Sequence, residues 1–196
     1  SPTPAANEAA CAEQFVRTFG RKLYRHPLST EEVERYKTVY AAARTGGYDF
    51  KTGIEWVVFS FLQSPGFLYR VELDAAGTSG VRAVTPIELA SRLSYLIWQS
   101  GPDETLLAAA EAGQLTTRAD LDVQARRMLD DPKARRLVGF FEQWLKWEKL
   151  DGLSRDATKF PGLPASLGPM MHNEVRLFTE NAVFEGDHTL KTLLTG

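Results

Sequence analysis

The stretch ELASRLSYLIWQSGPDE, residues 88–104, decides the fold class of this chain. Thr85 precedes it at an N-cap position, Pro86 takes the first helical position and Glu88 the third, and this arrangement forms a capping box. Three leucines are expected to face the core from the helix that begins there: Leu89, Leu93 and Leu96. A Gly-Pro pair at positions 101 and 102 then ends the helix and starts the next one. The stretch therefore predicts two consecutive helices joined by a tight turn.

Helical periodicity continues on both sides of this stretch. Ser29 and Glu32 form a second capping box, and apolar residues recur at steps of three and four along most of the chain. The longer helices are expected at residues 8–24, 29–46, 50–63, 85–100, 117–129, 133–149 and 165–184. No segment shows a convincing alternation of period two. The chain is therefore predicted to be all-α, with about eight helices in two packed helical subdomains and no significant sheet.

The same periodicity assigns several side chains to the core. Cys11 begins the apolar stripe of the first helix, and Leu62 ends that of the third. All four tryptophans lie on stripes of this kind: Trp56, Trp98, Trp144 and Trp147. Large aromatic residues at helical spacing fill a core more often than they bind a sugar, and only Trp98 and Trp147 are singled out here as able to reach a surface.

The chain divides at a short polar segment. Residues 74–83 (DAAGTSGVRA) are mostly small or polar and include two glycines, which is typical of a linker. Residues 1–9 are expected to be an extended lead-in, because Pro2 and Pro4 oppose helix formation. This leaves a small three-helix domain at residues 10–73 and a larger helical domain at residues 84–196.

The composition argues against several classes of partner and site. The 23 basic and 25 acidic side chains are interspersed and sum to a formal charge of -2, whereas a nucleic-acid groove needs clustered Lys and Arg. The longest apolar runs are far shorter than the ~20 residues that cross a bilayer, so no transmembrane segment is expected in this chain. Cys11 is the only cysteine, which excludes an internal disulfide, a CxxCH haem attachment and a cysteine-based zinc site.

The chain carries no catalytic signature. A GxSxG elbow, a glycine-rich phosphate loop and a dinucleotide fingerprint are all absent. The histidines have no second histidine or carboxylate at metal-ligand spacing, so no metal is expected. His172 follows Met170 and Met171, a tempting pair of axial haem ligands, but methionine more often fills a core. No cofactor is therefore expected in this chain, and whether it is an enzyme stays open.

Arginine and glutamate recur on both sides of the predicted linker. Glu88 and Arg92 are four residues apart on one helix face, and Arg70 and Glu72 follow an aromatic turn. An arginine can bind a carboxylate through two bonds and can stack on an aromatic ring. These residues are expected either to clamp the two halves of the chain together or to bind an anionic ligand. The candidate set is completed by three residues whose polar ends the fold does not require: Tyr95, Trp98 and Asp103.

Five segments, in order, resemble a known pair of domains. They are LYRHPLSTEEVERY, LQSPGFLYRVE, ELASRLSYLIWQSGPDETLLAAAEAGQL, ARRMLDDPKARRLVGFFEQWL and FPGLPASLGPMMHNEVRLFTE. The pair consists of adjacent domains of unknown function from large exported bacterial proteins, often called planctomycete-cytochrome-associated. The smaller domain would cover residues 10–72 and the larger one residues 84–196, which is nearly the whole chain.

The resemblance implies properties that the composition does not show. Members of this group are secreted or periplasmic, and a c-type haem is held by a separate domain of the full-length protein. The resemblance also implies that Cys11 forms a disulfide with a residue outside this chain, and that the chain is a fragment of a longer protein. Its implied partners are other domains or chains of the same exported assembly.

Three functions follow as hypotheses. The first is a helical scaffold or interaction module of a larger exported protein associated with a c-type cytochrome. The second is a part of a haem-dependent oxidoreductase that forms a substrate pocket from the candidate residues. The third is an extracellular module that binds polysaccharide through exposed tryptophans.

Overall fold

The computed structural model describes residues 5–70, 72, 83–156 and 158–195. Within these ranges all regular structure is helical, without any strand, and eight helices have at least seven residues. The all-α class with about eight helices is therefore confirmed. The contacts divide the chain into two compact units. The first contains Ser1–Tyr95 and Ser100–Ala125, and the second contains Leu96–Gln99 and Arg126–Gly196.

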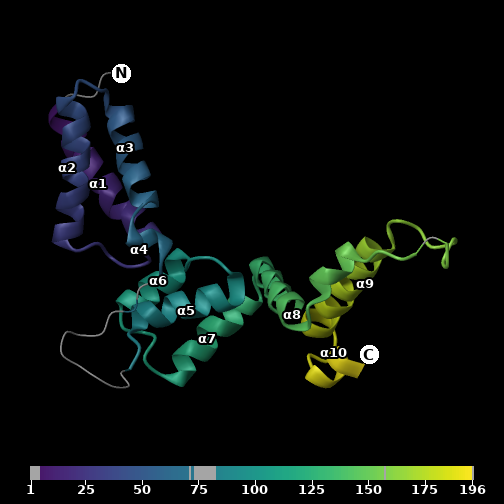
Figure 1. Ribbon diagram of the computed structural model, residues 1–196. Helices are drawn as coiled ribbons and strands as arrows, with labels where there is room; N and C mark the ends of the chain where they lie inside the picture. Colours follow the sequence, from purple (N-terminus) through teal and green to yellow (C-terminus); the bar gives the residue numbers. More distant parts are fainter. Residues whose placement is uncertain (1–4, 71, 73–82, 157, 196) are drawn as a thin grey trace. The chain divides into compact units, whose positions relative to one another are not determined.

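A bundle of three helices forms much of the first unit. Helices α1 (Ala5–Tyr24), α2 (Thr30–Thr45) and α3 (Phe50–Leu62) lie side by side in Figure 1, and the short α4 (Pro65–Leu68) follows. Val16, Val33 and Val57 are fully buried between them. The ring of Tyr36 stacks on that of the fully buried Phe61, with the centroids 3.5 Å apart. Each helix therefore contributes apolar side chains to one shared core.

Helix α1 begins earlier and buries a different line of residues than expected. It starts at Ala5, inside the region expected to be extended, because an alanine-rich segment follows Pro4. The first four residues of that expected lead-in lie outside the described residues. The buried residues of α1 recur every four positions: Ala12, Val16, Gly20 and Tyr24. Cys11 is exposed, so its assignment to the core was wrong.

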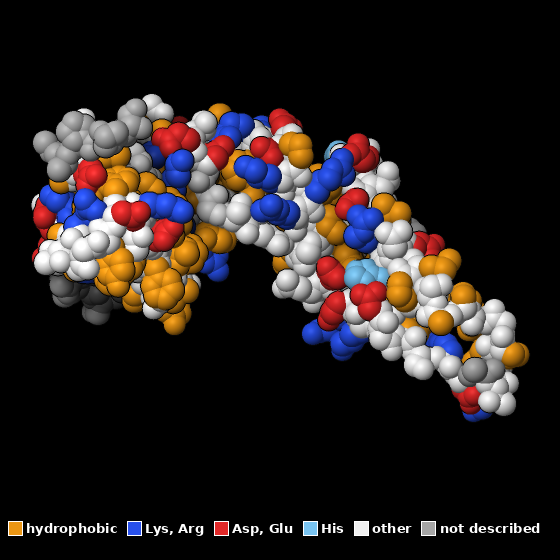
Figure 2. Space-filling view, turned by 90° about the horizontal axis from the view of Figure 1, so that it is seen from above, with side chains coloured by type: hydrophobic (Ala, Val, Ile, Leu, Met, Phe, Trp, Pro, Cys, Tyr) orange, Lys and Arg blue, Asp and Glu red, His pale blue; other side chains and the backbone are white. Residues whose placement is uncertain are grey.

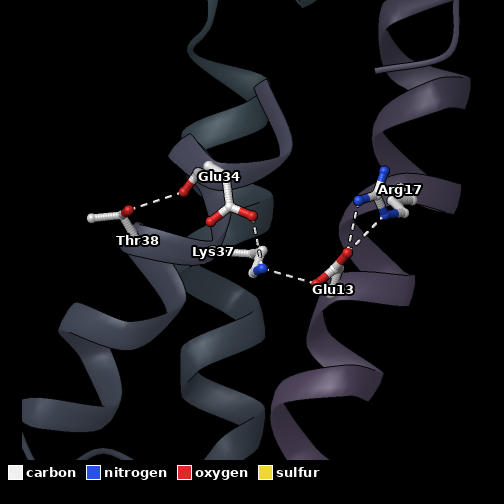
Figure 3. Close-up of polar contacts among 5 residues, drawn as sticks. All are labelled: Glu13, Arg17, Glu34, Lys37 and Thr38. Carbon is white, nitrogen blue, oxygen red and sulfur yellow. Dashed lines mark hydrogen bonds and ion pairs between the residues drawn. The ribbon is translucent and has the colours of Figure 1, made fainter. Parts of the chain in front are cut away.

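Polar side chains join α1 to α2 along the outside of the bundle (Figure 3). The Nζ of Lys37 lies 2.9 Å from Oε2 of Glu13 and 2.8 Å from Oε1 of Glu34. Arg17 donates to the other oxygen of Glu13 over 2.7 Å. Because such exposed pairs are screened by water, they contribute little stability and mainly support the pairing of the two helices.

The helix predicted from residues 88–104 is α5 (Pro86–Trp98). Its capping box is confirmed: the amide of Thr85 donates to Oε2 of Glu88 over 2.8 Å, and the amide of Glu88 donates to Oγ1 of Thr85 over 3.3 Å. Gln99 then adopts a φ of 52° and ends the helix. The buried residues of α5 are Ala90, Ser94, Ile97 and Trp98. Leu96 is 63% exposed, so the prediction that it faces the core was wrong.

The first unit also contains α6 (Glu104–Glu111) and most of α7 (Arg118–Leu129). Arg21 on α1 holds α6 by donating to Glu111 and Glu104 over 2.7 Å each. These two carboxylates raise the pKa of the Arg21 guanidinium, with Glu111 the larger contributor. The predicted linker lies outside the described residues, apart from residue 83.

In the second unit, three shorter helices take the place of the single helix expected at residues 133–149. These are the 3-10 helix η1 (Pro132–Leu137), α8 (Val138–Leu145) and the 3-10 helix η2 (Trp147–Gly152). The break occurs at Lys146, whose φ of 60° places it in the left-handed region. Helix α9 (Leu167–Glu180) packs so closely on η2 that a Cβ on Gly168 would collide with the carbonyl oxygen of Leu150.

The chain then continues through the π-helix η3 (Asn181–Glu185) to α10 (Leu190–Thr195). The helix expected at residues 165–184 therefore changes its hydrogen-bond pattern near its end, which apolar periodicity does not reveal. None of the helices in the described ranges is both long enough and apolar enough to cross a membrane.

Candidate functional site

A pocket of about 430 Å³ in the first unit brings together residues from α1, α4, α5 and the segment after α4. The arginines, the glutamates and the histidine among its described lining residues are Arg25, His26, Arg70, Glu72, Glu88 and Arg92. Four of these belong to the candidate set: Arg70, Glu72, Glu88 and Arg92. Gly66 allows α4 to approach Tyr24, since a Cβ at Gly66 would lie 2.7 Å from the tyrosine ring. The pocket thus combines charged side chains with a close contact between α4 and the ring of Tyr24.

Arg25 is a buried charged residue of the pocket lining that the sequence had not indicated. Its side chain is only 6% exposed, and its Nη2 donates to the carbonyl oxygens of Gly66 over 2.6 Å and Tyr69 over 2.8 Å. Among the described residues no carboxylate pairs with Arg25, so its charge is satisfied by backbone dipoles alone. Its φ of 64° is uncommon for a residue other than glycine, asparagine or aspartate. The neighbouring LYRHP segment offered no signal for this conformation.

Arg92 and Glu72 form a bidentate ion pair at the rim of the pocket. The Nε of Arg92 lies 2.7 Å from Oε1 of Glu72, and its Nη2 lies 2.5 Å from Oε2. The pair joins residues on either side of the predicted linker within the first unit. Glu88 accepts hydrogen bonds from the amide and the hydroxyl of Thr85, over 2.8 and 3.0 Å. Its carboxylate therefore serves both the helix cap and the wall of the pocket.

Arg70 differs from the other two arginines. Its guanidinium carbon lies 4.7 Å from the ring centroid of Tyr95, a cation–π distance. The guanidinium carbon of Arg25 lies 6.0 Å from the same centroid. Considering only described residues, Arg70 makes no hydrogen bond or ion pair. Tyr95 is thus placed against two arginines of the pocket, and Arg70 retains its donors.

The remaining two candidates lie elsewhere. Trp98 is fully buried in the second unit, where its Nε1 donates to the carbonyl oxygen of Met128 over 2.9 Å. Lys133 lies against the same indole, with its Nζ 4.7 Å from the ring centroid. Asp103 is the N-cap of α6 and accepts from the amide of Leu106 over 2.9 Å. The fold thus gives both residues structural contacts outside the pocket.

The tryptophans are distributed differently from the sequence expectation. Trp147 is buried, like Trp98, so neither of the two residues singled out for sugar stacking offers an open ring face. Trp56 and Trp144, both assigned to the core, are instead 42% and 49% exposed. The ring of Trp144 stacks on that of Phe140, with the centroids 6.0 Å apart. Periodicity identified the helices that carry these residues, but not the face that each helix buries.

His172 joins three elements of the second unit. Its Nδ1 lies 2.7 Å from Oδ2 of Asp151 on η2, and its Nε2 lies 3.0 Å from Oε1 of Glu142 on α8. The hydrogen bond with Asp151 is the main cause that raises the pKa of His172. Both ring nitrogens are occupied by carboxylates, so this histidine does not fit the role of an axial haem ligand.

The other two histidines each use one ring nitrogen locally. Nδ1 of His26 contacts the carbonyl oxygen of Pro27 over 2.8 Å, and Nδ1 of His188 contacts that of Val183 over 2.9 Å. Across the described ranges, no group of three or more His, Cys, Asp or Glu side chains is arranged to hold a metal ion.

The outer face of α3 is apolar. Trp56, Phe59 and Leu62 follow one another at steps of three and are 42%, 67% and 41% exposed. Tyr48 lies against Trp56, with the ring centroids 5.3 Å apart. In Figure 2, hydrophobic side chains gather on one side of the three-helix bundle. We call Tyr48, Trp56, Phe59 and Leu62 the α3 face. Its existence corrects the expectation that Leu62 and Trp56 lie in the core.

Comparison with known proteins gives a family but no activity. The family model described as PSD5, "Protein of unknown function (DUF1595)", matches residues 11–72. That described as PSD4, "Protein of unknown function (DUF1592)", matches residues 84–196, more than half of the chain. Neither a curated protein nor a solved structure shows a significant match. Both families are known as planctomycete cytochrome C-associated domains, which confirms the resemblance found in the sequence. The chain therefore belongs to the planctomycete cytochrome C-associated family described as PSD4, and carries a PSD5 match in its first part.

Proposed function

We propose that this chain is a helical interaction module of a larger exported protein associated with a c-type cytochrome, in which the α3 face contacts another domain of the same protein. The observation that carries the proposal is the exposure of Trp56, Phe59 and Leu62 on a single helix face. The cytochrome association of both matching families supports the choice of partner.

The chemistry of the α3 face favours a protein partner. Contiguous apolar side chains on a surface mark interaction sites, because their removal from water is favourable. Aromatic residues such as Trp56 and Tyr48 are enriched among the side chains that dominate interface energies. Phe59, the most exposed of the four, is expected to contribute most, because it has the largest area to bury.

Side-chain oxidation footprinting tests this proposal. Trp56 and Phe59 should react more slowly with hydroxyl radicals in the full-length protein than in the 196-residue chain. The c-type cytochrome domain, expressed separately, should bind the chain, and Phe59→Ser should weaken that binding by about tenfold or more. Val123→Ser is the matched control, since Val123 is an exposed apolar residue of α7 outside the α3 face.

The proposal fails if Trp56 and Phe59 react equally fast in the two proteins. Equal binding of the cytochrome domain by the Phe59→Ser and Val123→Ser variants would also contradict it.

A second candidate function is supported by the arginine pocket. Arg70, Glu72, Glu88 and Arg92 share one cavity, as expected for a part of a haem-dependent oxidoreductase that shapes a substrate pocket. The c-type haem would lie on a separate domain of the full-length protein, since the single cysteine of this chain does not provide a CxxCH attachment site. This candidate requires that Arg70→Gln lower turnover by the haem-loaded full-length protein. Unchanged turnover would exclude the pocket from the reaction.

A further inference from the structure

Among the contacts of the described residues, the N–H donors of Arg70 have no acceptor. The guanidinium carries five N–H donors in a planar fork that matches the two oxygens of a carboxylate. The guanidinium carbon lies 4.7 Å from the ring centroid of Tyr95, and this cation–π contact holds the guanidinium beside the ring. Arg92, by contrast, already donates two N–H groups to Glu72. Of the arginines in the pocket, Arg70 is therefore the one best placed to bind a carboxylate.

The charge of the pocket also favours an anion. Three arginines and two glutamates are found among the described residues that line it, and together they carry one formal positive charge when the histidine is neutral. The buried Arg25 contributes most to this imbalance, because its partners Gly66 and Tyr69 supply carbonyl oxygens rather than a carboxylate. A positive charge removed from water acts through a low dielectric, so an anion entering beside it is attracted more strongly than at an open surface.

His26 adds a second requirement on the ligand. Its Nδ1 lies 2.8 Å from the carbonyl oxygen of Pro27, which can only accept, so Nδ1 must carry a proton. In the neutral ring Nε2 is then an acceptor, and the contacts of the described residues leave it unoccupied. Because His26 lines the pocket, a hydroxyl group of a ligand can donate to it.

We propose that this pocket binds a small hydroxylated carboxylate of the size of a sugar acid, with its carboxylate on Arg70 and a hydroxyl group on His26. A volume of about 430 Å³ admits a molecule of that size. The inference concerns the same cavity as the second candidate function and supplies its ligand class. Binding of this ligand requires neither a haem nor a docking partner.

Calorimetric titration of the 196-residue chain with three probes tests the ligand class. D-glucuronate has both the carboxylate and the hydroxyl groups, D-glucose lacks the carboxylate, and cyclohexanecarboxylate lacks the hydroxyl groups. Glucuronate should bind about tenfold or more tightly than glucose, since a charge-assisted bond is lost with the neutral sugar. Cyclohexanecarboxylate should bind more weakly than glucuronate, and His26→Ala should reduce that difference.

Substitution of Arg70 tests the position. Arg70→Gln should weaken glucuronate binding by about ten- to hundredfold, because the fork and its charge are removed together. Arg35→Gln is the matched control: Arg35 is an exposed arginine of α2 that does not line the pocket. Circular dichroism of both variants checks that they fold.

Three results would overturn the inference. The first is the absence of glucuronate binding at about 10 mM, where even millimolar affinity gives a signal. The second is equal affinity of the Arg70→Gln and Arg35→Gln variants for glucuronate. The third is tighter binding of inorganic phosphate than of glucuronate. Because binding is measured on the isolated chain without turnover, none of them depends on the α3 face or on a haem domain.

Discussion

Gly20 lies where α1 packs closely against Phe61 of α3 and against Leu28. A Cβ at this position would lie 2.5 Å from Cδ1 of Leu28 and 2.6 Å from Cζ of Phe61, both shorter than a van der Waals contact. The absence of a side chain therefore lets α1 turn the line from Ala12 to Tyr24 toward the core. Cys11, one position away from Ala12, is rotated by about 100° and becomes exposed.

Gly20→Ala should therefore destabilise the three-helix bundle. The intrinsic gain in helix propensity is about 1 kcal/mol, but overpacking against Phe61 costs about 1 to 3 kcal/mol, so we expect a net loss of about 1 kcal/mol. Denaturant unfolding followed by circular dichroism measures this change. The control is Gly162→Ala, where a Cβ would meet no atom within 4 Å. An increase in stability for Gly20→Ala would show that the close approach is not as described.

At the scale of elements, the sequence indicates where a helix begins better than where a helix is interrupted. The capping box of α2 is complete: the amide of Ser29 donates to Oε2 of Glu32 over 2.8 Å, and the amide of Glu32 donates to Oγ of Ser29 over 3.1 Å. Its residues are three apart in the sequence, so the pattern was visible there. The left-handed conformation of Lys146 separates α8 from η2, and no glycine or proline marks this position in the sequence.

Ser29→Ala should lower the free energy of unfolding by about 1 kcal/mol, because the amide of Glu32 loses its acceptor at the start of α2. Ser29→Thr should retain most of the stability, since threonine supplies an equivalent hydroxyl. Chemical denaturation at constant pH compares the two variants. Equal stability of Ser29→Ala and the unmodified protein would mean that water replaces the cap without loss.

At the scale of the whole molecule, a histidine and several carboxylates make stability depend on pH in opposite directions. Asp151, together with Glu142, holds the pKa of His172 above its ordinary value in the folded state. Protonation of His172 therefore stabilises the second unit below the unfolded pKa of about 6.5, and this stabilisation is lost as the pH rises through the higher folded value. Carboxylates such as Asp49, whose pKa is lowered chiefly by the backbone amide of Thr52, stabilise above about pH 4.

Unfolding of the second unit should accordingly become easier as the pH is raised from about 6 to about 8. Thermal unfolding across that range measures the effect, and His172→Gln should remove most of the decline because glutamine does not titrate. His188→Gln is a control, since His188 is bonded to a carbonyl oxygen rather than to carboxylates. A decline of the same size in the His172→Gln protein would assign it to other groups.

Some residues of the candidate site were named from the sequence, and others were missed. Residue chemistry indicated only that these arginines can bind a carboxylate or stack on an aromatic ring. In the fold, Arg92 pairs with Glu72 and Arg70 lies against Tyr95. Arg25 was missed because its role depends on a left-handed backbone and on carbonyl oxygens about forty residues away. Asp151 and Glu142 were also missed as partners of His172, because they lie on other elements and meet it only in the folded chain.

The sequence by itself determined the all-α class, the two capping boxes and the family, because these depend on neighbouring residues, on apolar periodicity and on five ordered segments. Only the tertiary structure decided which apolar residues are buried. A periodic stripe is wider than the face that packing covers, so Cys11, Trp56 and Leu96 remain in contact with water. The arginine pocket also required the tertiary structure, because its charges come from segments that meet only when the first unit has folded.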